Sequence, residues 1–221
     1  MTSCNIDHLA IVAPSLESGA ALVERVLGVS LQTGGEHPRM GTHNLLLSLG
    51  ESLYLEVIAP NPRGDAPERP RWFNLDVLRK DTPPRLATWV VRTPDIYKSL
   101  RDASEHLGVE EPMSRGKLNW RISIPEDGSL PLGGVAPTLI QWEAGALHPA
   151  AKLEPRGISL KELRLYTPEP ERLLRLLASL SFEGPVSVHP LSPGESPRLE
   201  AQMVTPHGLR LLSCVSPDLP E

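Results

Sequence analysis

Hydrophobic and polar positions follow one order at the start of the chain. An alternating apolar run comes first, then apolar side chains at helical spacing, then three more alternating runs: residues 5–13, 16–27, 30–35, 43–49 and 53–58. A period of two predicts strands, and spacing near 3.6 predicts a helix. Ser15 and Gly28 stand where a helix takes its N-cap and C-cap. Residues 4–60 are therefore predicted to form a strand–helix–strand–strand–strand unit.

The same order returns twice, over residues 85–145 and 157–216. In the second unit, Pro94 and Gly108 mark the predicted start and end of the helix. Self-similarity with a period of several tens of residues indicates repeated structural modules. We expect an α+β fold of βαβββ modules, in which two modules (residues 1–150) pair into a curved, barrel-like sheet around a cavity. A third, degenerate module (residues 151–221) is appended, and it either packs outside this cup or completes a sheet across a homodimer.

Composition narrows the classes of protein to which the chain can belong. Its 221 residues are 40% hydrophobic, and 22 basic against 27 acidic side chains leave a net charge of -5. No basic stripe suggests nucleic-acid binding, and no apolar stretch is long enough for a membrane span. Neither a signal peptide nor a CxxC pair is readable, so Cys4 and Cys214 are interpreted as reduced thiols of a cytoplasmic protein. The expected partner is a small-molecule ligand.

Glu56 is the first candidate for chemistry, because it interrupts the apolar run 53–58. Burying a carboxylate is costly unless a partner compensates for it. Strand alternation places Glu56 on one face with Tyr54 and Ile58, and it places His8 on one face with its neighbours at positions 6 and 10. His8 and Glu56 are therefore candidate catalytic residues on the wall of the cavity.

Aligning the three units on the prolines that end their first strands shows what the other modules carry. His8 falls opposite Thr88 and Glu162, and matching the last strands puts Glu56 opposite Gln141. Matching the third strands of the first two units puts His43 and Asn44 opposite Trp120 and Arg121. These four residues and Gln141 are the candidates for contact with a substrate. Arg121 is also a candidate ion-pair partner for Glu56. His37 and His148 both precede proline and are interpreted as loop-positioning residues.

Several segments resemble one known family. "IDHLAIVAPSLESGAALVERVLGV", "GTHNLLLSLGESLYLEVIAP", "LATWVVRTPD", "NWRISIPEDG" and "LIQWEAGALHPA" are similar to glyoxalase-like domain proteins of the vicinal oxygen chelate superfamily. The resemblance covers residues 6–151 and implies a fold of paired βαβββ modules. It also implies a divalent metal (zinc, manganese, iron or nickel), held by a histidine of the first strand and a glutamate of the fourth strand of one module together with the two equivalent residues of the partner module. The residues at the matching positions of the first module are His8 and Glu56.

The partner positions depart from the family pattern, because Thr88 and Gln141 are poor metal ligands. Glu162 of the third unit is a further possible ligand. Two functions stay open: a metal-dependent enzyme of the lyase, isomerase or dioxygenase type, and a metal-free protein that binds or sequesters a small molecule, as some resistance proteins of the superfamily do. A third alternative is a partner-binding role, for which the proline-rich connection 59–72 would be the docking loop.

Overall fold

The computed structural model of the chain describes residues 3–116 and 118–213. Within these residues the strands are β1 (Asn5–Val12), β2 (Gln32–His37), β3 (Thr42–Ser48), β4 (Tyr54–Pro60), β5 (Arg85–Arg92), β6 (Val109–Arg115), β7 (Leu118–Ile124), β8 (Thr138–Trp142), β9 (Ser159–Thr167), β10 (Val186–Pro190), β11 (Arg198–Thr205) and β12 (Gly208–Ser213). The α-helices are α1 (Leu16–Leu27), α2 (Ile96–Asp102) and α3 (Pro170–Ser179). The predicted order of elements therefore recurs three times.

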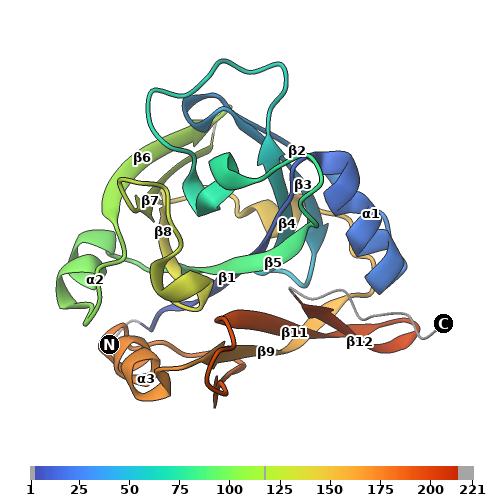
Figure 1. Ribbon diagram of the computed structural model, residues 1–221. Helices are drawn as coiled ribbons and strands as arrows, with labels where there is room; N and C mark the ends of the chain where they lie inside the picture. Colours follow the sequence, from blue (N-terminus) through green and yellow to red (C-terminus); the bar gives the residue numbers. More distant parts are fainter. Residues whose placement is uncertain (1–2, 117, 214–221) are drawn as a thin grey trace.

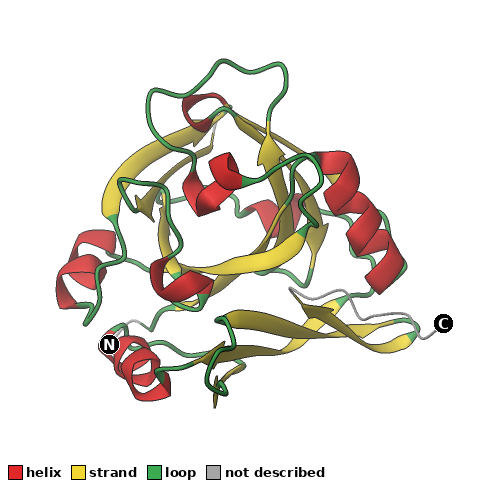
Figure 2. Cartoon of the chain, in the orientation of Figure 1, coloured by secondary structure: helices red, strands yellow, loops and turns green. Residues whose placement is uncertain are grey.

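The first two modules share one curved sheet of eight strands, in the order β2-β3-β4-β1-β5-β8-β7-β6. Within each module the first strand runs parallel to the last, and β1 pairs antiparallel with β5 to join the modules. The sheet curls until its two edges meet (Figures 1 and 2), where the Arg39 guanidinium donates across the seam to the carbonyl of Pro112, with 2.6 Å between the atoms. The predicted α+β fold of paired βαβββ modules is confirmed.

Helix α1 begins and ends where the sequence predicts. The Ser15 hydroxyl accepts a hydrogen bond from the amide of Ser18, and Gly28 adopts the left-handed conformation with a φ of 72°. Glycine tolerates this conformation because it has no Cβ. On the helix, Gly19 lies so close to β4 that an added Cβ would be 2.3 Å from Cγ1 of Val57. The missing side chain lets α1 pack tightly on the outside of the barrel.

Helix α2 begins at the Asp95 N-cap but ends at Asp102, six residues before the predicted end at Gly108. A tertiary contact accompanies the early end, because the amide of Ser104 donates to the Ser179 hydroxyl at the end of α3. Gly108 instead lies against the backbone of Ile124, where an added Cβ would be 2.3 Å away. Its role is a close approach to β7 rather than a helix cap.

The third unit has the predicted element order but a different strand pairing. Its four-stranded sheet has the order β10-β9-β11-β12, and β9 pairs in parallel with β10. This sheet lies against the outside of β1 and β5 (Figure 1). Apolar side chains of both sheets form one core, which includes Leu9, Ile11, Trp89, Leu163, Leu165, Leu199 and Met203. Of the two expected arrangements for the odd module, packing outside the cup is confirmed.

Two remaining expectations concern the membrane and the thiols. Among the described residues, no helix combines the length and apolar character that crossing a membrane requires. Cys4 is buried and free, whereas Cys214 lies outside the described residues.

Candidate functional site

The barrel encloses a small cavity of about 30 Å³, which is room for about two water molecules. It is lined by His8, His37, Asn44, Tyr54, Glu56, Trp72, Phe73, Arg115, Trp120, Ile122, Ile140 and Trp142. Trp72 and Phe73 come from the connection between β4 and β5, which crosses one end of the barrel (Figure 1). The cavity is therefore narrow, largely aromatic, and polar on the side formed by the first module.

A β-bulge in β1 decides which side chains of this strand enter the barrel. Ile6 pairs with Val91 and His8 with Val90, so Asp7 is the extra residue. A bulge lets two consecutive residues share one side of a strand. As a result Asp7 and His8 both point inward, while Ile6 joins the outer core. The expectation that positions 6 and 8 share a face is wrong, because simple alternation fails across the bulge.

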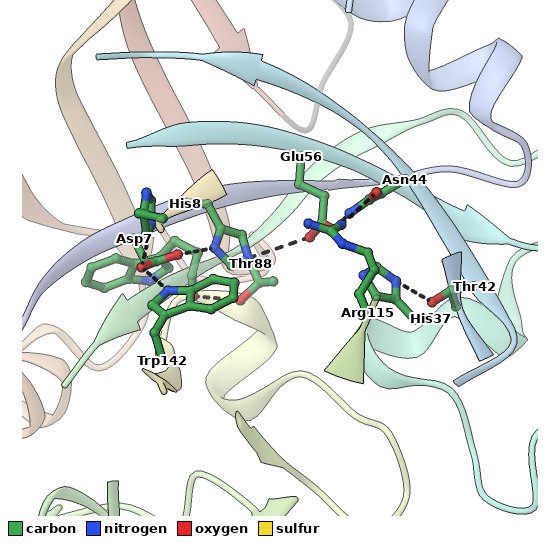
Figure 3. Close-up of polar contacts among 11 residues, drawn as sticks. Asp7, His8, His37, Thr42, Asn44, Glu56, Thr88, Arg115 and Trp142 are labelled. Atoms are coloured by element: carbon green, nitrogen blue, oxygen red, sulfur yellow. Dashed lines mark hydrogen bonds and ion pairs between the residues drawn. The ribbon is translucent and has the colours of Figure 1, made fainter. Parts of the chain in front are cut away.

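Asp7 is a completely buried carboxylate with three hydrogen-bond donors. It accepts from His8 Nδ1 at 2.8 Å, from Trp142 Nε1 at 2.9 Å and from His148 Nε2 at 3.0 Å (Figure 3). Burial by itself raises the pKa of Asp7, but the hydrogen bonds from the two histidines outweigh it and hold the pKa well below its usual range. An ionised Asp7 keeps a proton on His8 Nδ1 and orients the imidazole ring.

His8 turns its other nitrogen towards Glu56, and the distance from Nε2 to Oε2 is 3.6 Å. The Glu56 side chain is buried, and its Oε1 accepts a hydrogen bond from Asn44 Nδ2 at 2.5 Å. The ring of Tyr54 stacks on the imidazole of His8 with centroids 4.5 Å apart. Burial and the neighbouring carboxylates of Asp7 and Glu56 raise the pKa of Tyr54. The buried carboxylate of Glu56 therefore has two polar partners, the imidazole of His8 and the side-chain amide of Asn44 (Figure 3).

The Asn44 amide is held in one orientation from its other side. Its Oδ1 accepts from the amide of Gly35 at 2.8 Å and from Arg115 Nη1 at 3.2 Å. Because two donors fix the oxygen, the amide NH₂ group must face Glu56. Arg115, at the end of β6, is thus the basic residue that adjoins the site, and Arg121 is not.

His37, the last residue of β2, also lies in the cavity rather than in a loop. Its Nδ1 is 3.1 Å from the Thr42 hydroxyl, and its ring meets the edges of Trp72 and Trp120. Burial lowers the pKa of His37 to about 4, although the charge of Glu56 partly opposes this. His37 is therefore a neutral hydrogen-bonding group of the wall at physiological pH.

The structure brings together only part of the predicted site. Asn44 and Trp120 line the cavity with His8 and Glu56. His43, Arg121 and Gln141 lie on the outer face of the barrel, each next in sequence to an inward residue of the same strand. Arg121 bonds the Tyr97 hydroxyl and Glu110, and Gln141 Oε1 accepts from the amide of Ile96. Their expected position in this cavity is wrong, because strand alternation points each of these side chains away from it.

The second module repeats the bulge of the first but not its chemistry. Ala10 pairs with Thr88 and Ile11 with Leu86, so a second bulge brings Thr88 to the position that matches His8. Ala10 and Val90 are equivalent positions, each two residues after His8 or Thr88. Ala10 of β1 pairs with Glu56 of β4, and Val90 of β5 pairs with Thr138 of β8. Thr138, not Gln141, is thus the counterpart of Glu56. Both matching positions carry a neutral hydroxyl.

The side chains present are an incomplete donor set for a metal ion. Catalytic zinc sites use three protein ligands and structural sites four. In this cavity His8 Nε2 and Glu56 Oε2 face each other, whereas His37 lies on the wall with its Nδ1 bonded to the Thr42 hydroxyl. In the described part of the chain, no group of three or more His, Cys, Asp or Glu side chains is placed to hold a metal. Glu162 lies on the third sheet, bonded to Arg164 and Ser187, so it cannot complete the set.

Comparison with known proteins identifies the relatives of the chain. The sequence profile of a glyoxalase-like domain family matches residues 6–181. No curated protein matches significantly. A hypothetical protein from Staphylococcus aureus is similar in structure, with a TM-score of 0.53 and 11% identity over 99% of this chain and 88% of that one. Weaker structural similarity is found to a hypothetical protein from Bacillus halodurans (TM-score 0.42, 14% identity over 66% of this chain and 97% of that one). It is also found to methylmalonyl-CoA epimerase from Mycobacterium tuberculosis (TM-score 0.42, 18% identity over 64% of this chain and 88% of that one).

Proposed function

The chain belongs to the glyoxalase-like domain family, and on that premise we propose that it is a small-molecule enzyme that moves a proton next to a carbonyl group. His8 and Glu56 act as the acid–base pair. The observation that carries this proposal is the buried Asp7–His8–Glu56 row, in which an imidazole held by one carboxylate faces a second carboxylate across 3.6 Å.

The row supports proton transfer for reasons of geometry. Asp7 holds the proton of His8 on Nδ1, which leaves Nε2 directed towards the cavity and Glu56. Glu56 can take a proton from a substrate carbon while His8, carrying a proton on each nitrogen, gives its Nε2 proton to the neighbouring carbonyl oxygen, which forms an enol. When His8 takes a proton back from an enol oxygen and Glu56 returns its proton to a different carbon, the result is an isomerisation. Effective general acids and bases have to lie within hydrogen-bond reach of the proton they transfer. Asn44 holds Glu56 in place for this role.

The burial of the pair supports the same proposal. The side chains of His8 and Glu56 are 5% and 7% exposed, and charge interactions are stronger where water is scarce. Because the cavity has room for about two water molecules, a substrate enters only when lining side chains or the connection that carries Trp72 moves.

Metal-assisted chemistry at His8 and Glu56 is the alternative enzyme proposal, and metal-free sequestration of a ligand is the alternative outside catalysis. The ligand-poor Thr88 and Thr138 favour proposals without a metal. Incubation with zinc, manganese, iron and nickel, followed by desalting and elemental analysis, tests the first alternative. We expect less than stoichiometric metal on the wild type and no difference from Glu56→Gln. A stoichiometric ion that Glu56→Gln loses would establish the metal proposal instead.

Deuterium incorporation tests the proton-transfer proposal directly. The protein, treated with a chelator, is incubated in heavy water with a panel of small aldehydes, ketones and 2-oxo acids, and exchange next to the carbonyl is followed by NMR. We expect exchange with at least one compound, and we expect Glu56→Gln and His8→Gln to slow it by at least about 100-fold, which is within the range of general acid–base catalysis. Lys98→Gln, on the exposed face of α2, is the control. Ligand binding without exchange would favour sequestration.

A further inference from the structure

Arg115 is a cation at the cavity wall. It lines the cavity, and within residues 3–116 and 118–213 its guanidinium makes one side-chain hydrogen bond, to Asn44 Oδ1. Among the described residues no Asp or Glu oxygen lies within 4 Å of its guanidinium, whereas Arg39 and Arg69 nearby both pair with Glu111. A guanidinium carries five N–H donors, so most of the hydrogen-bonding capacity of Arg115 is left for another acceptor.

Two glycines of β2 make room for this side chain. A Cβ at Gly35 would lie 2.7 Å from Cδ of Arg115, and a Cβ at Gly34 would lie 2.0 Å from Oδ1 of Asn44. The "TGGEH" segment therefore lets the arginine cross from β6 over the edge of β2 and reach Asn44. Glycine in a strand commonly marks such a close approach.

Arg115 also lies at a boundary. Outside the seam between β2 and β6 is an open groove of about 530 Å³, and Arg115 lines both this groove and the inner cavity. In Figure 3 its guanidinium is directed towards Asn44 and Glu56. A ligand that reaches the acid–base pair through the seam therefore has to pass the arginine.

We propose that Arg115 binds a carboxylate of the substrate, so that the substrate is a small oxo acid rather than a neutral aldehyde or ketone. The inference rests on the proposed function, since it specifies the compound on which His8 and Glu56 act. The forked guanidinium matches a carboxylate with two parallel hydrogen bonds. In the same position the arginine holds the acid end of the substrate while the carbonyl end points to Glu56.

A binding measurement tests this substrate class without relying on catalysis. Tryptophan fluorescence is titrated with pyruvate and with pyruvamide, its neutral analogue of nearly equal shape, at constant ionic strength. Three of the four tryptophans line the cavity, so its occupation changes the signal. We expect the wild type to bind pyruvate about 10- to 100-fold more tightly, the value of one charged hydrogen-bonding contact.

Three variants and one control decide the outcome. Arg115→Gln should abolish the preference for pyruvate, Arg115→Lys should keep part of it, and Gly35→Ala should weaken it by displacing the arginine. Arg101→Gln, an exposed arginine of α2, should leave it unchanged. The inference is overturned if the wild type binds neither compound or binds both equally, or if the preference survives Arg115→Gln. It is also overturned if Arg115→Gln weakens the binding of both ligands equally, because that result indicates that Arg115 only positions Asn44. Glu56→Gln should keep the preference while proton exchange stops, which separates failure of the inference from failure of the proposed function.

Discussion

Replacing Asp7 with asparagine removes one buried charge and keeps the shape of the side chain. In the wild type the two carboxylate oxygens of Asp7 accept three N–H groups, from His8, Trp142 and His148. Asparagine offers one acceptor oxygen, and its NH₂ group is itself a donor. Unless a histidine changes its tautomer, at least one of the three N–H groups would therefore face another donor.

The expected loss of stability follows from these contacts. The two histidines can respond by changing tautomer, but the indole of Trp142 is always a donor. The oxygen of the new asparagine side chain therefore has to face Trp142 Nε1. A hydrogen bond to a charged group contributes about 1.5–3 kcal/mol, and an unsatisfied buried donor costs about 1–3 kcal/mol. Allowing for tautomer changes, we expect Asp7→Asn to lose about 2–4 kcal/mol of unfolding free energy. For a chain of this size that lowers Tm by roughly 5–15 °C.

The pH dependence provides the sharper assay. Because the folded-state pKa of Asp7 lies below its value in the unfolded chain, the stabilisation is complete above about pH 4 and is lost as the pH falls further. Urea unfolding of wild type and Asp7→Asn should therefore differ most at neutral pH, and the difference should begin to shrink as the pH falls from 4 to 3. Asp65→Asn, at an exposed position of the connection between β4 and β5, is the control and should cause no measurable change. A difference below about 0.5 kcal/mol, the range of ordinary surface substitutions, or one constant down to pH 3, would refute the role given to Asp7.

Three further results are expected. The folded-state pKa of His37 is about 4, which is below its value in the unfolded chain, so the contribution of His37 to stability falls as the pH drops from 6.5 to 4. Between pH 7 and pH 5, urea unfolding should therefore show that the wild type loses about 2 kcal/mol more unfolding free energy than His37→Gln. Gly19→Ala should lower the unfolding free energy by about 1–3 kcal/mol, because its Cβ would overlap Val57 in a packed core, and a loss below 0.5 kcal/mol would contradict that packing. Arg121→Gln should leave pyruvate binding unchanged, since Arg121 lies on the outer face; weakened binding would return it to the site.

Local patterns were enough to predict most elements of the fold. The caps of α1 at Ser15 and Gly28, the three repeats of the βαβββ order and the face that Glu56 shares with Tyr54 and Ile58 all depend on neighbours within a few residues. A helix cap or a strand alternation is set by short-range sterics and hydrogen bonding. The same reasoning predicted the early candidates His8 and Glu56, which the structure places 3.6 Å apart.

Contacts between distant segments decided the rest. The bulge that turns Asp7 inward exists only because β1 lies beside β5, and α2 ends early where Ser104 meets α3. Arg115 reaches the site only because the barrel closes until β6 lies beside the glycines of β2. Register, closure and burial depend on which strand is the neighbour, and that is a property of the whole packed chain. The sequence by itself therefore determined the modules and the imidazole–carboxylate pair, while the tertiary structure decided which charged groups surround that pair.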